Sequence, residues 1–436
     1  MTSVSPNALS NDTHARQQNL LAKYQALRSF TDRIVAPLEP EDCVIQSMPD
    51  VSPARWHLAH TTWFFETFVL KPLPGFRACD ERFEYLFNSY YNAVGEQFPR
   101  AQRGLLSRPT VAEILDYRRR IDEQVAARLD SEQTLTEHEL DVVELGLNHE
   151  QQHQELMLTD IKHVLSCNPL MPRYESAELQ VGRAAEAARW IEFDEGLYEI
   201  GHTGNDFAFD NESPRHRVFL DSFALRDQTV TVGEYLEFIG DGGYQRPELW
   251  LSLGWNQVHT HGWKAPLYWV QQDGVWTEFT LGGQVELQPS LPVCHVSYFE
   301  ADAFARWAGV RLATEAEWEV ASEGTCAEGN FATSLMESGA AIHPGGGPVN
   351  PSGLQHVFGN VWEWTSSSYA AYPGYQPPDG ALGEYNGKFM CNQYVLRGGS
   401  CATPGGHVRR TYRNFFPPES RWQFSGIRLA RALEGP

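Results

Sequence analysis

Two histidines four residues apart are the part of this sequence best suited to bind a metal ion. His149 and His153 lie within residues 148–155, inside a longer run, 141–166, whose apolar residues recur at spacings of three and four. This spacing predicts an amphipathic helix. Because an α-helix turns once in about 3.6 residues, the two imidazoles would lie on one face and could hold one metal ion. Gln152 lies beside that face, and a third ligand has to come from elsewhere in the chain.

The third ligand could come from an earlier helix. Ser52 is suited to an N-cap and Pro53 to the first helical position, so a helix is predicted to begin there. His57 and His60 follow on nearly the same face, and the spacing alone leaves both open as the third ligand. The aromatic residues at 63–68 are predicted to pack in the core and to exclude water from such a site.

A segment rich in turn-forming residues, 88–104, carries two adjacent tyrosines and two arginines. Tyr90 and Tyr91 can each donate a proton or a hydrogen bond. Arg100 and Arg103 can each bind a carboxylate through two parallel hydrogen bonds. Loops that carry such side chains often serve function, whereas the structural alternative is a surface loop with packed tyrosine rings.

Length and composition predict more than one domain. The chain has 436 residues, which exceeds the size of one typical core. Up to about residue 172 it is rich in Leu, Glu, Gln and Arg, as helical domains are, and from about residue 190 it is dense in Gly, Trp, Tyr, Pro and Asn. We expect these regions in order: a flexible N-terminus at 1–16, a helical domain at 17–172, a linker at 173–189 and a loop-rich α+β domain at 190–433.

Charge and cysteine content narrow the class of protein. The formal net charge of −22 argues against nucleic acid or an anionic membrane as a partner, since both are polyanions. Seven cysteines without a C-x-x-C pattern suit a reducing cytosol better than a disulfide framework. Without an apolar run of ~18 residues or a signal-like N-terminus, the sequence predicts a cytoplasmic enzyme that is neither secreted nor membrane-inserted. No oligomeric state is predicted.

The histidine motifs resemble those of the DinB superfamily. Its members are four-helix bundles in which an N-terminal D-x-A-H or H-L-A-H and a later H-x-x-x-H hold a metal ion with three histidines. Here His60 ends the sequence W-H-L-A-H at 56–60. The resemblance therefore implies that His60, and not His57, is the third ligand beside His149 and His153.

The second half carries a separate series of motifs rich in Gly and Trp. In order they are residues 193–201, 292–297, 303–319, 359–365, 396–400 and 425–430. They resemble the formylglycine-generating-enzyme (FGE-sulfatase) fold, which is related to C-type lectins, and they are predicted to be mostly scaffold. Formylglycine-generating enzymes bind copper through two cysteines just beyond an R-G-G-S stretch. Here Cys401 has no second cysteine after it in residues 402–412, which argues against sulfatase maturation.

A DinB-like four-helix bundle followed by a C-type-lectin-like, FGE-sulfatase domain resembles the ergothioneine-biosynthesis sulfoxide synthases, a family called EgtB. Such enzymes use non-haem Fe(II), O2 and a thiol to form a C–S bond at the imidazole C2 of Nα-trimethylhistidine (hercynine), giving a sulfoxide. The resemblance implies an α-helical bundle followed by an α+β domain, and the same activity. Three neutral histidines would leave three octahedral positions on Fe(II) for the substrate imidazole, the thiolate and O2.

The resemblance also implies how hercynine is bound. Gln152 matches a family glutamine that orients the substrate imidazole by a hydrogen bond. A quaternary ammonium group cannot donate hydrogen bonds and is best held by aromatic faces. Phe415 and Phe416 are the expected aromatic residues, because the segment 413–417 resembles the family's segment at that place.

Reducing O2 requires protons, and a tyrosine near the metal can supply one. In one branch of the family this tyrosine lies in the loop before R-G-G-S, where Tyr385 is the nearest equivalent. In the branch that this sequence resembles, Tyr90 and Tyr91 are better placed. We expect the proton donor to be one of this pair.

The thiol substrate is predicted from the same loop. Family members that use γ-glutamylcysteine carry two arginines three residues apart after the first histidine ligand, whereas the matching residues here are Gln97 and Arg100. The loss of one carboxylate clamp favours L-cysteine, with γ-glutamylcysteine as the alternative. Arg100 or Arg103 would bind the cysteine carboxylate, with Asn386 and Lys388 as further candidates.

Two functions of other classes compete with this assignment. The sequence H-E-Q-Q-H at 149–153 also fits the zinc-metalloprotease pattern H-E-x-x-H, in which Glu150 would be the general base. Glu175 or Glu178 could then be the third ligand, but the second half of the chain would have no explanation. A lectin-like binding module with an inert metal bundle would consume no O2 and would not need the paired tyrosines.

Overall fold

The computed structural model describes residues 6–179, 187–345 and 353–433 and divides the chain into two compact units. The first unit is Met1–Cys167 and the second is Asn168–Pro436. None of the helices in the described ranges has the length and apolar character needed to span a lipid bilayer.

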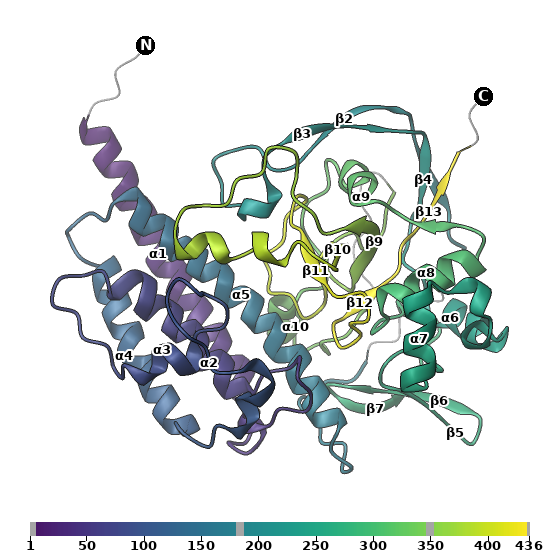
Figure 1. The fold of residues 1–436 in the computed structure, drawn as a ribbon, viewed down its shortest axis with the longest axis horizontal. Coiled ribbons are helices and arrows are strands. Elements are labelled where there is room, and N and C mark those ends of the chain that lie inside the picture. The colour runs from purple at the N-terminus through teal and green to yellow at the C-terminus, as the bar shows by residue number, and fades with distance from the viewer. Residues whose placement is uncertain (1–5, 180–186, 346–352, 434–436) are drawn as a thin grey trace. The chain divides into compact units, whose positions relative to one another are not determined.

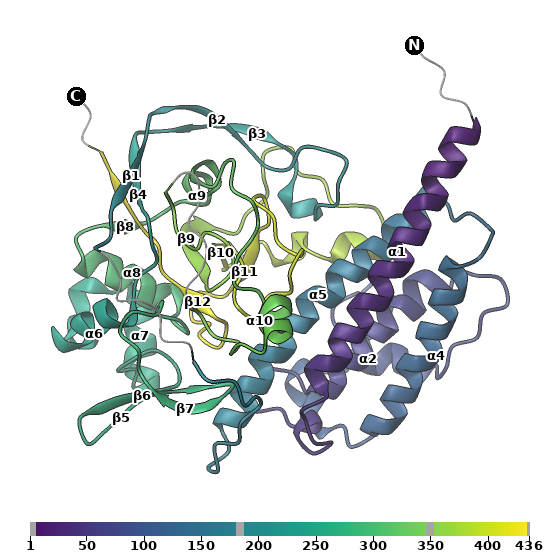
Figure 2. The same ribbon diagram turned by 180° about the vertical axis from the view of Figure 1, so that it is seen from behind.

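The first unit is built on four main helices that pack side by side, as Figures 1 and 2 show from opposite sides. In its described residues these are α1 (Pro6–Val35), α2 (Ala54–Phe65), α4 (Val111–Leu129) and α5 (Glu137–Ser166). Both α1 and α2 contact α4 and α5. The shorter helical segments are Asp42–Val44, Glu66–Leu70, α3 (Arg82–Phe87) and Arg100–Leu105. The first unit is therefore the predicted four-helix bundle.

Local sequence signals set the start of two of these helices. Thr110 accepts a hydrogen bond from the backbone N–H of Glu113, whose carboxylate in turn accepts one from the backbone N–H of Thr110, and this pair starts α4. Thr136 and Glu139 start α5 in the same way. Such reciprocal caps satisfy N–H groups that the helix itself leaves unpaired. The helix that carries the paired histidines thus has a start that its own sequence specifies.

The first helix begins at Pro6, although a flexible N-terminus was predicted at 1–16. Arg16 ties this part of α1 to α5, because its guanidinium contacts Glu137 at 2.7 Å and Glu144 at 2.8 Å. These contacts are polar, so the pattern of apolar residues did not indicate a helix there.

Part of the predicted linker at 173–189 is attached to the second unit. The backbone N–H groups of Tyr174 and Glu175 donate to the carbonyl of Leu281, at 2.8 and 3.1 Å. The Glu175 carboxylate accepts the backbone N–H of Ile342 at 2.9 Å. Residues 180–186 of the linker lie outside the described ranges.

The described residues of the second unit contain short strands in four sheets. One antiparallel sheet has the order β1 (Trp190–Phe193), β4 (Phe223–Arg226), β13 (Leu429–Ala432), β8 (Arg311–Leu312). Another has the order β11 (Asn414–Phe416), β10 (Tyr394–Arg397), β9 (Trp362–Ser368), β12 (Ser425–Gly426), with only β12 parallel to its neighbour. The smaller antiparallel sheets are β2 (Gly196–Ile200) with β3 (His216–Leu220), and β5 (Trp269–Gln272), β6 (Val275–Thr280) and β7 (Gly283–Glu286).

Short helices accompany these sheets. They are α6 (Val232–Gly240), α7 (Ser252–His261), α8 (Tyr298–Trp307), α9 (Glu315–Ala321) and α10 (Ala332–Ser338). Single helical turns occur at Asp210–Glu212, Gly243–Gln245, Pro247–Leu249, Ala381–Glu384 and Gly387–Phe389. Helix α8 packs against α6 and α7 (Figure 1). This content confirms the α+β class predicted for the second half of the chain.

A buried ion pair joins motifs of the second unit that are far apart in the sequence. Glu363 on β9 receives two hydrogen bonds from Arg428, at 2.6 and 2.8 Å, and one from the indole N–H of Trp318 at 2.7 Å. Trp362 and Trp364 on the same strand are each 1% exposed. Because the buried charges are paired and hydrogen-bonded, the Gly- and Trp-rich motifs can form a stable scaffold.

Candidate metal centre

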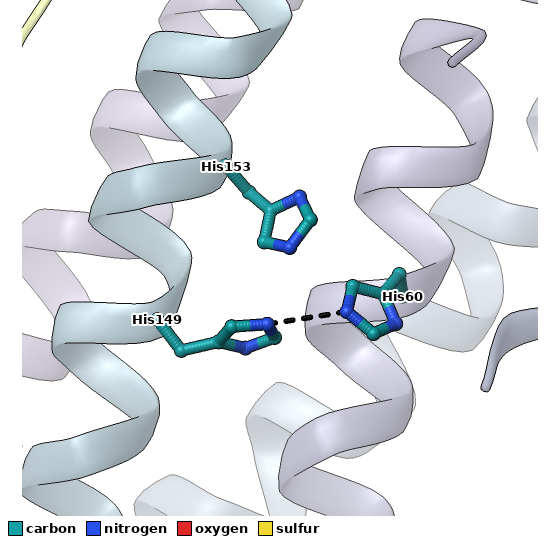
Figure 3. A group of neighbouring side chains, drawn as sticks. All are labelled: His60, His149 and His153. Carbon is teal, nitrogen blue, oxygen red and sulfur yellow. Dashed lines mark hydrogen bonds between the residues drawn. The ribbon is translucent and has the colours of Figure 1, made fainter. Parts of the chain in front are cut away.

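Three histidines from two helices of the first unit meet at one point. Helix α5 carries His149 and His153, α2 carries His60, and the three rings point toward one another (Figure 3). Each offers a ring nitrogen within 4.8 Å of the others, and all three side chains are buried. Nε2 of His60 lies 3.1 Å from Nε2 of His149. Gln152, three residues after His149 on α5, is half-buried.

A hydrogen bond determines which nitrogen of His60 can bind a metal ion. Its Nδ1 lies 2.6 Å from the carbonyl oxygen of Phe87, the last residue of α3, so Nδ1 carries the proton and donates it to that bond. Nε2 is left with its lone pair and faces His149. A carbonyl behind a ligating imidazole is common in metal sites, because it fixes the orientation of the ring and raises its basicity.

Burial keeps the three imidazoles neutral. Desolvation lowers the pKa of His149 to about 3 and holds the pKa values of His60 and His153 well below the usual range. Repulsion from the neighbouring histidines lowers the pKa values of His60 and His153 further. Neutral imidazoles are suitable ligands for Zn, Cu, Fe and Ni. The cluster therefore fits a transition metal bound by nitrogen atoms.

Aromatic rings surround the cluster. The imidazole of His60 is nearly parallel to the rings of Trp56 and Trp63, whose centroids lie 4.6 and 5.7 Å away. Phe64 packs against His149 with centroids 4.7 Å apart. All five side chains are buried, and excluding water in this way strengthens electrostatic interactions inside the site.

Glu150 does not belong to the histidine cluster. Its carboxylate is fully buried and accepts hydrogen bonds from Arg28 at 2.7 Å, Arg118 at 2.9 Å and Thr31 at 2.6 Å. Burial alone would raise its pKa, but the two guanidinium groups hold the pKa down to about 2. Both oxygens are engaged with α1 and α4, so Glu150 is not available as the general base of a zinc protease. The match to H-E-x-x-H is a coincidence of spacing.

The loop after α3 carries the two tyrosines. The buried side chain of Asn88 shapes this loop, because its amide donates to the carbonyl of Tyr91 at 2.9 Å and its oxygen accepts the N–H of Tyr91 at 3.0 Å. Tyr91 is buried against Trp63, with centroids 5.8 Å apart, and the ring of Tyr90 lies 4.6 Å from that of Tyr91. Since Trp63 also packs on His60, the tyrosines adjoin the rings around the cluster. Sequence reasoning missed Asn88, whose signal was an Asn opening a turn-rich segment.

The two arginines of this loop differ in their surroundings. Arg103 is 3% exposed, its guanidinium carbon lies 3.3 Å from the ring centroid of Trp56, and it donates to the hydroxyl groups of Ser52 and Ser89. Burial holds its pKa well below the usual range. Among the described residues no carboxylate forms an ion pair with it. Arg100 is exposed and donates to a backbone carbonyl.

The predicted ammonium-binding residues lie on β11 of the second unit. Phe415 stacks on Tyr369, with ring centroids 4.0 Å apart and planes 10° from parallel. The ring centroid of Phe389 lies 6.0 Å from that of Phe415. Phe416 packs on Trp422 at 5.8 Å. Both phenylalanines are half-buried. A partly exposed cluster of aromatic rings is the kind of surface that attracts a quaternary ammonium group.

The remaining predicted residues of the second unit have partners within that unit. Tyr385 is buried and stacks on Phe209, with centroids 5.4 Å apart. Asn386 is buried and donates to Asp210 at 2.6 Å, and Lys388 pairs with a glutamate four residues before it. A role of these three residues in binding substrate stays a prediction.

Comparisons with known proteins match both units. Residues 23–157 match the DinB superfamily, and residues 177–433 match the sulfatase-modifying factor enzyme 1-like domain of the FGE-sulfatase family. The chain is 34% identical to the hercynine oxygenase of Mycolicibacterium thermoresistibile over 88% of each chain. It is 32% identical to that of Mycobacterium tuberculosis over 92% of this chain and 96% of the relative. The Mycolicibacterium smegmatis hercynine oxygenase is 35% identical over 66% of this chain and 70% of the relative.

Fold and site together define a two-domain protein, in which a DinB bundle with a three-histidine cluster precedes an FGE-sulfatase domain. This confirms the fold predicted from the motifs. The chain belongs to the hercynine oxygenase family, which confirms the resemblance to EgtB. It is an oxygen-dependent oxidoreductase, and this excludes the lectin-like binding module as its function.

Proposed function

We propose that the protein is an Fe(II)-dependent synthase that joins hercynine to L-cysteine as a sulfoxide, a step of ergothioneine biosynthesis. The observation that supports it most directly is the cluster of three buried, neutral imidazoles in a chain aligned with hercynine oxygenases along most of its length. His60, His149 and His153 are the proposed ligands. Fe(II) bound by these residues would supply redox chemistry with O2.

The proposed reaction balances without an external reductant. A C–S bond forms between the imidazole C2 of hercynine and the sulfur of cysteine, each of which loses a hydrogen, and this oxidation removes two electrons. Addition of one oxygen atom to sulfur removes two more. One O2 accepts all four electrons, because its second oxygen atom leaves as water with the two hydrogens.

Hercynine has an imidazole and a trimethylammonium group, and we assign different residues to each. Gln152 can hydrogen-bond to the imidazole, because it lies on the same helix as two of the proposed ligands and beside their face. Phe415 and Phe416 are assigned to the ammonium group, since each aromatic face contributes roughly 0.5–2 kcal/mol to binding a cation.

We assign Arg103 to the carboxylate of the thiol substrate. Among the described residues, the buried guanidinium of Arg103 donates to two hydroxyl groups, so it retains donors for an anion. A carboxylate bound by two parallel hydrogen bonds would offset the desolvation of this group. Arg100 is exposed and bonded to a backbone carbonyl, so it suits this role less well. One such clamp favours L-cysteine, which has one carboxylate, over γ-glutamylcysteine, which has two.

Proton transfer is assigned to Tyr90 or Tyr91. The hydrogens that hercynine C2 and the thiol lose have to reach the oxygen atom that becomes water. A phenol can donate a proton and regain one in the same cycle. Tyr385, buried against Phe209, is the alternative donor.

The proposal is tested by loading the protein with Fe(II) without oxygen and then following O2 uptake and products. Hercynine is supplied with either L-cysteine or γ-glutamylcysteine, and the products are identified by mass spectrometry. We expect uptake that requires both hercynine and cysteine, with one O2 consumed for each cysteinyl sulfoxide formed. His60→Ala, which removes a proposed ligand, serves as the control and should neither retain iron nor consume O2.

Other outcomes correct or refute the proposal. O2 uptake that requires hercynine and γ-glutamylcysteine, with none when cysteine is the thiol, would overturn the choice of thiol and keep the reaction type. Cysteine sulfinate without coupled product would indicate a thiol dioxygenase. No uptake with either thiol, from protein shown to contain iron, would refute the synthase assignment.

A further inference from the structure

A fourth histidine lies directly behind the proposed ligands. His57 on α2 is 2% exposed, and its Nδ1 lies 2.8 Å from Nδ1 of His153. On the other side of the ring, Nε2 lies 3.1 Å from Oδ2 of Asp160, a residue of α5 that is 4% exposed. The same oxygen accepts the backbone N–H of Ser52 at 2.8 Å. A continuous chain of hydrogen bonds therefore runs from Asp160 through His57 to His153.

The chemistry of these groups determines the direction of each hydrogen bond. An ionised carboxylate can only accept, so His57 donates from Nε2 to Asp160. A neutral His57 ring then has its lone pair on Nδ1, and His153 donates to it from its own Nδ1. The lone pair of His153 is left on Nε2. This is the nitrogen that remains free to bind a metal ion.

We propose that His57 and Asp160 are positioning residues that fix the proton of His153 on Nδ1 and hold its ring in place for the metal. The inference rests on the proposed metal site and adds two residues to it. The backbone carbonyl of Phe87 does the same for His60, so two ligands on different helices are each held from behind. Loss of such partners typically weakens metal binding by about 10–100-fold.

The pair also places a negative charge near a site whose ligands are all neutral. Asp160 polarises His57, and His57 in turn accepts a hydrogen bond from His153, which makes Nε2 of His153 a better donor to a cation. Ser52 holds the carboxylate in place through its backbone N–H, while its hydroxyl accepts from Arg103. Ser52 thus holds both Arg103, which is assigned to the substrate carboxylate, and Asp160, where the hydrogen-bond chain behind His153 begins.

Three variants separate positioning from packing. His57→Asn can place an amide oxygen near the position of Nδ1 and still accept from His153, whereas His57→Leu offers no acceptor. Asp160→Asn retains an oxygen that can accept from Ser52 and His57 but removes the charge. His163→Asn is a matched control, because this histidine lies on the same helix and its Nδ1 bonds to Ser47 instead, at 2.6 Å.

The measurements are Co(II) affinity by competition with a chelator, the Co(II) absorption spectrum, and the unfolding free energy of each metal-free protein. We expect affinity about 10–100-fold weaker in His57→Leu, a much smaller loss in His57→Asn, an intermediate loss in Asp160→Asn, and none in His163→Asn. A purely structural role predicts that His57→Leu and His57→Asn lose stability while both bind Co(II) as the wild type does.

The outcomes also separate this inference from the proposed function. Wild-type protein that binds no Co(II) at the histidine cluster would overturn the metal site itself. Wild-type binding together with unchanged affinity in His57→Leu, or equal losses in His57→Leu and His57→Asn, would leave the metal site standing and overturn the positioning role. Unchanged affinity in Asp160→Asn would overturn the part assigned to its charge.

Discussion

Arg103 holds its guanidinium against Trp56 and two serine hydroxyls, where water solvates it poorly. Lysine at this position would keep a positive charge but lose the planar fork and the stacking. We expect Arg103→Lys to raise the KM for cysteine by about tenfold or more, because a bidentate charged contact is lost, while the KM for hercynine changes little. Steady-state O2 uptake measures both constants. Arg100→Lys is the control in the same loop, and an unchanged cysteine KM in Arg103→Lys would move the carboxylate elsewhere.

The paired tyrosines can be separated by removing one hydroxyl at a time. Tyr90→Phe and Tyr91→Phe retain both aromatic rings, so the ring contact between the two residues and the packing of residue 91 against Trp63 are preserved. We expect the variant that lacks the proton donor to form coupled sulfoxide about 10²–10⁴-fold more slowly and the other variant to differ only modestly from wild type. Product quantification by mass spectrometry, with cysteine sulfinate measured alongside, gives the rates. Small effects in both variants together with a large one in Tyr385→Phe would reassign the donor.

The histidines show which metal ligands can be predicted from residue spacing alone and which cannot. Residues four apart share a helix face, so His149 and His153 could be predicted as a pair of ligands from the sequence of α5 alone. On α2, His57 and His60 are three apart and nearly equivalent, and only the resemblance distinguished them. The structure brings His60 into the cluster and places His57 behind His153. The difference depends on how α2 packs against α5, which a single sequence does not specify.

At the scale of elements, α5 presents one face to the histidine cluster and another to a buried ion network. Glu150 joins it to Arg28 of α1 and Arg118 of α4. Glu150→Gln would remove the buried anion that these two guanidinium groups share and leave each with its second carboxylate partner, Asp122 for Arg28 and Asp32 for Arg118. We expect it to lower the unfolding free energy by about 1–3 kcal/mol. Denaturant unfolding measures this loss, and Glu137→Gln, which removes an exposed carboxylate from the same helix, should cost far less.

Metal affinity and turnover of the folded Glu150→Gln protein provide the second half of that test. Because the Glu150 carboxylate is directed away from the histidine cluster, we expect the metal affinity and the turnover of the folded variant to stay near the wild-type values. A folded, metal-loaded variant without turnover would instead restore Glu150 as a participant in the chemistry.

Elements of the two units differed in how well the sequence predicted them. The helix predicted at 141–166 is present and begins at Glu137, after a Thr136–Glu139 cap that the sequence itself displays. In the second unit only the class and the scaffold motifs were predictable. Its described strands are two to seven residues long, and β4, from the middle of the chain, pairs with β13, which lies near the C-terminal end. Such pairing depends on contacts that local patterns do not encode.

On the scale of the whole molecule, the family match spans both units, whereas the three candidate ligands lie in the first. The FGE-sulfatase domain has a buried scaffold around Glu363, and no second cysteine follows Cys401 in residues 402–412. A metal bound by the histidines should therefore stabilise elements of the first unit directly.

Amide hydrogen exchange can locate that stabilisation within the chain. A ligand that binds only the folded state stabilises it by about 2.7 kcal/mol at a concentration of 100 Kd. Since the proposed ligands join α2 to α5, we expect Fe(II), added without oxygen, to slow exchange in both helices, and a chelator to reverse the effect. Peptides from β9 and β10, which carry none of the proposed ligands, serve as the internal reference against which the exchange rates of α2 and α5 are compared. His149→Ala treated in the same way should gain no protection, which separates binding at the cluster from binding elsewhere. Iron that binds without protecting α2 and α5 would have to occupy a different site, and the oxygen chemistry would then have to be sought there.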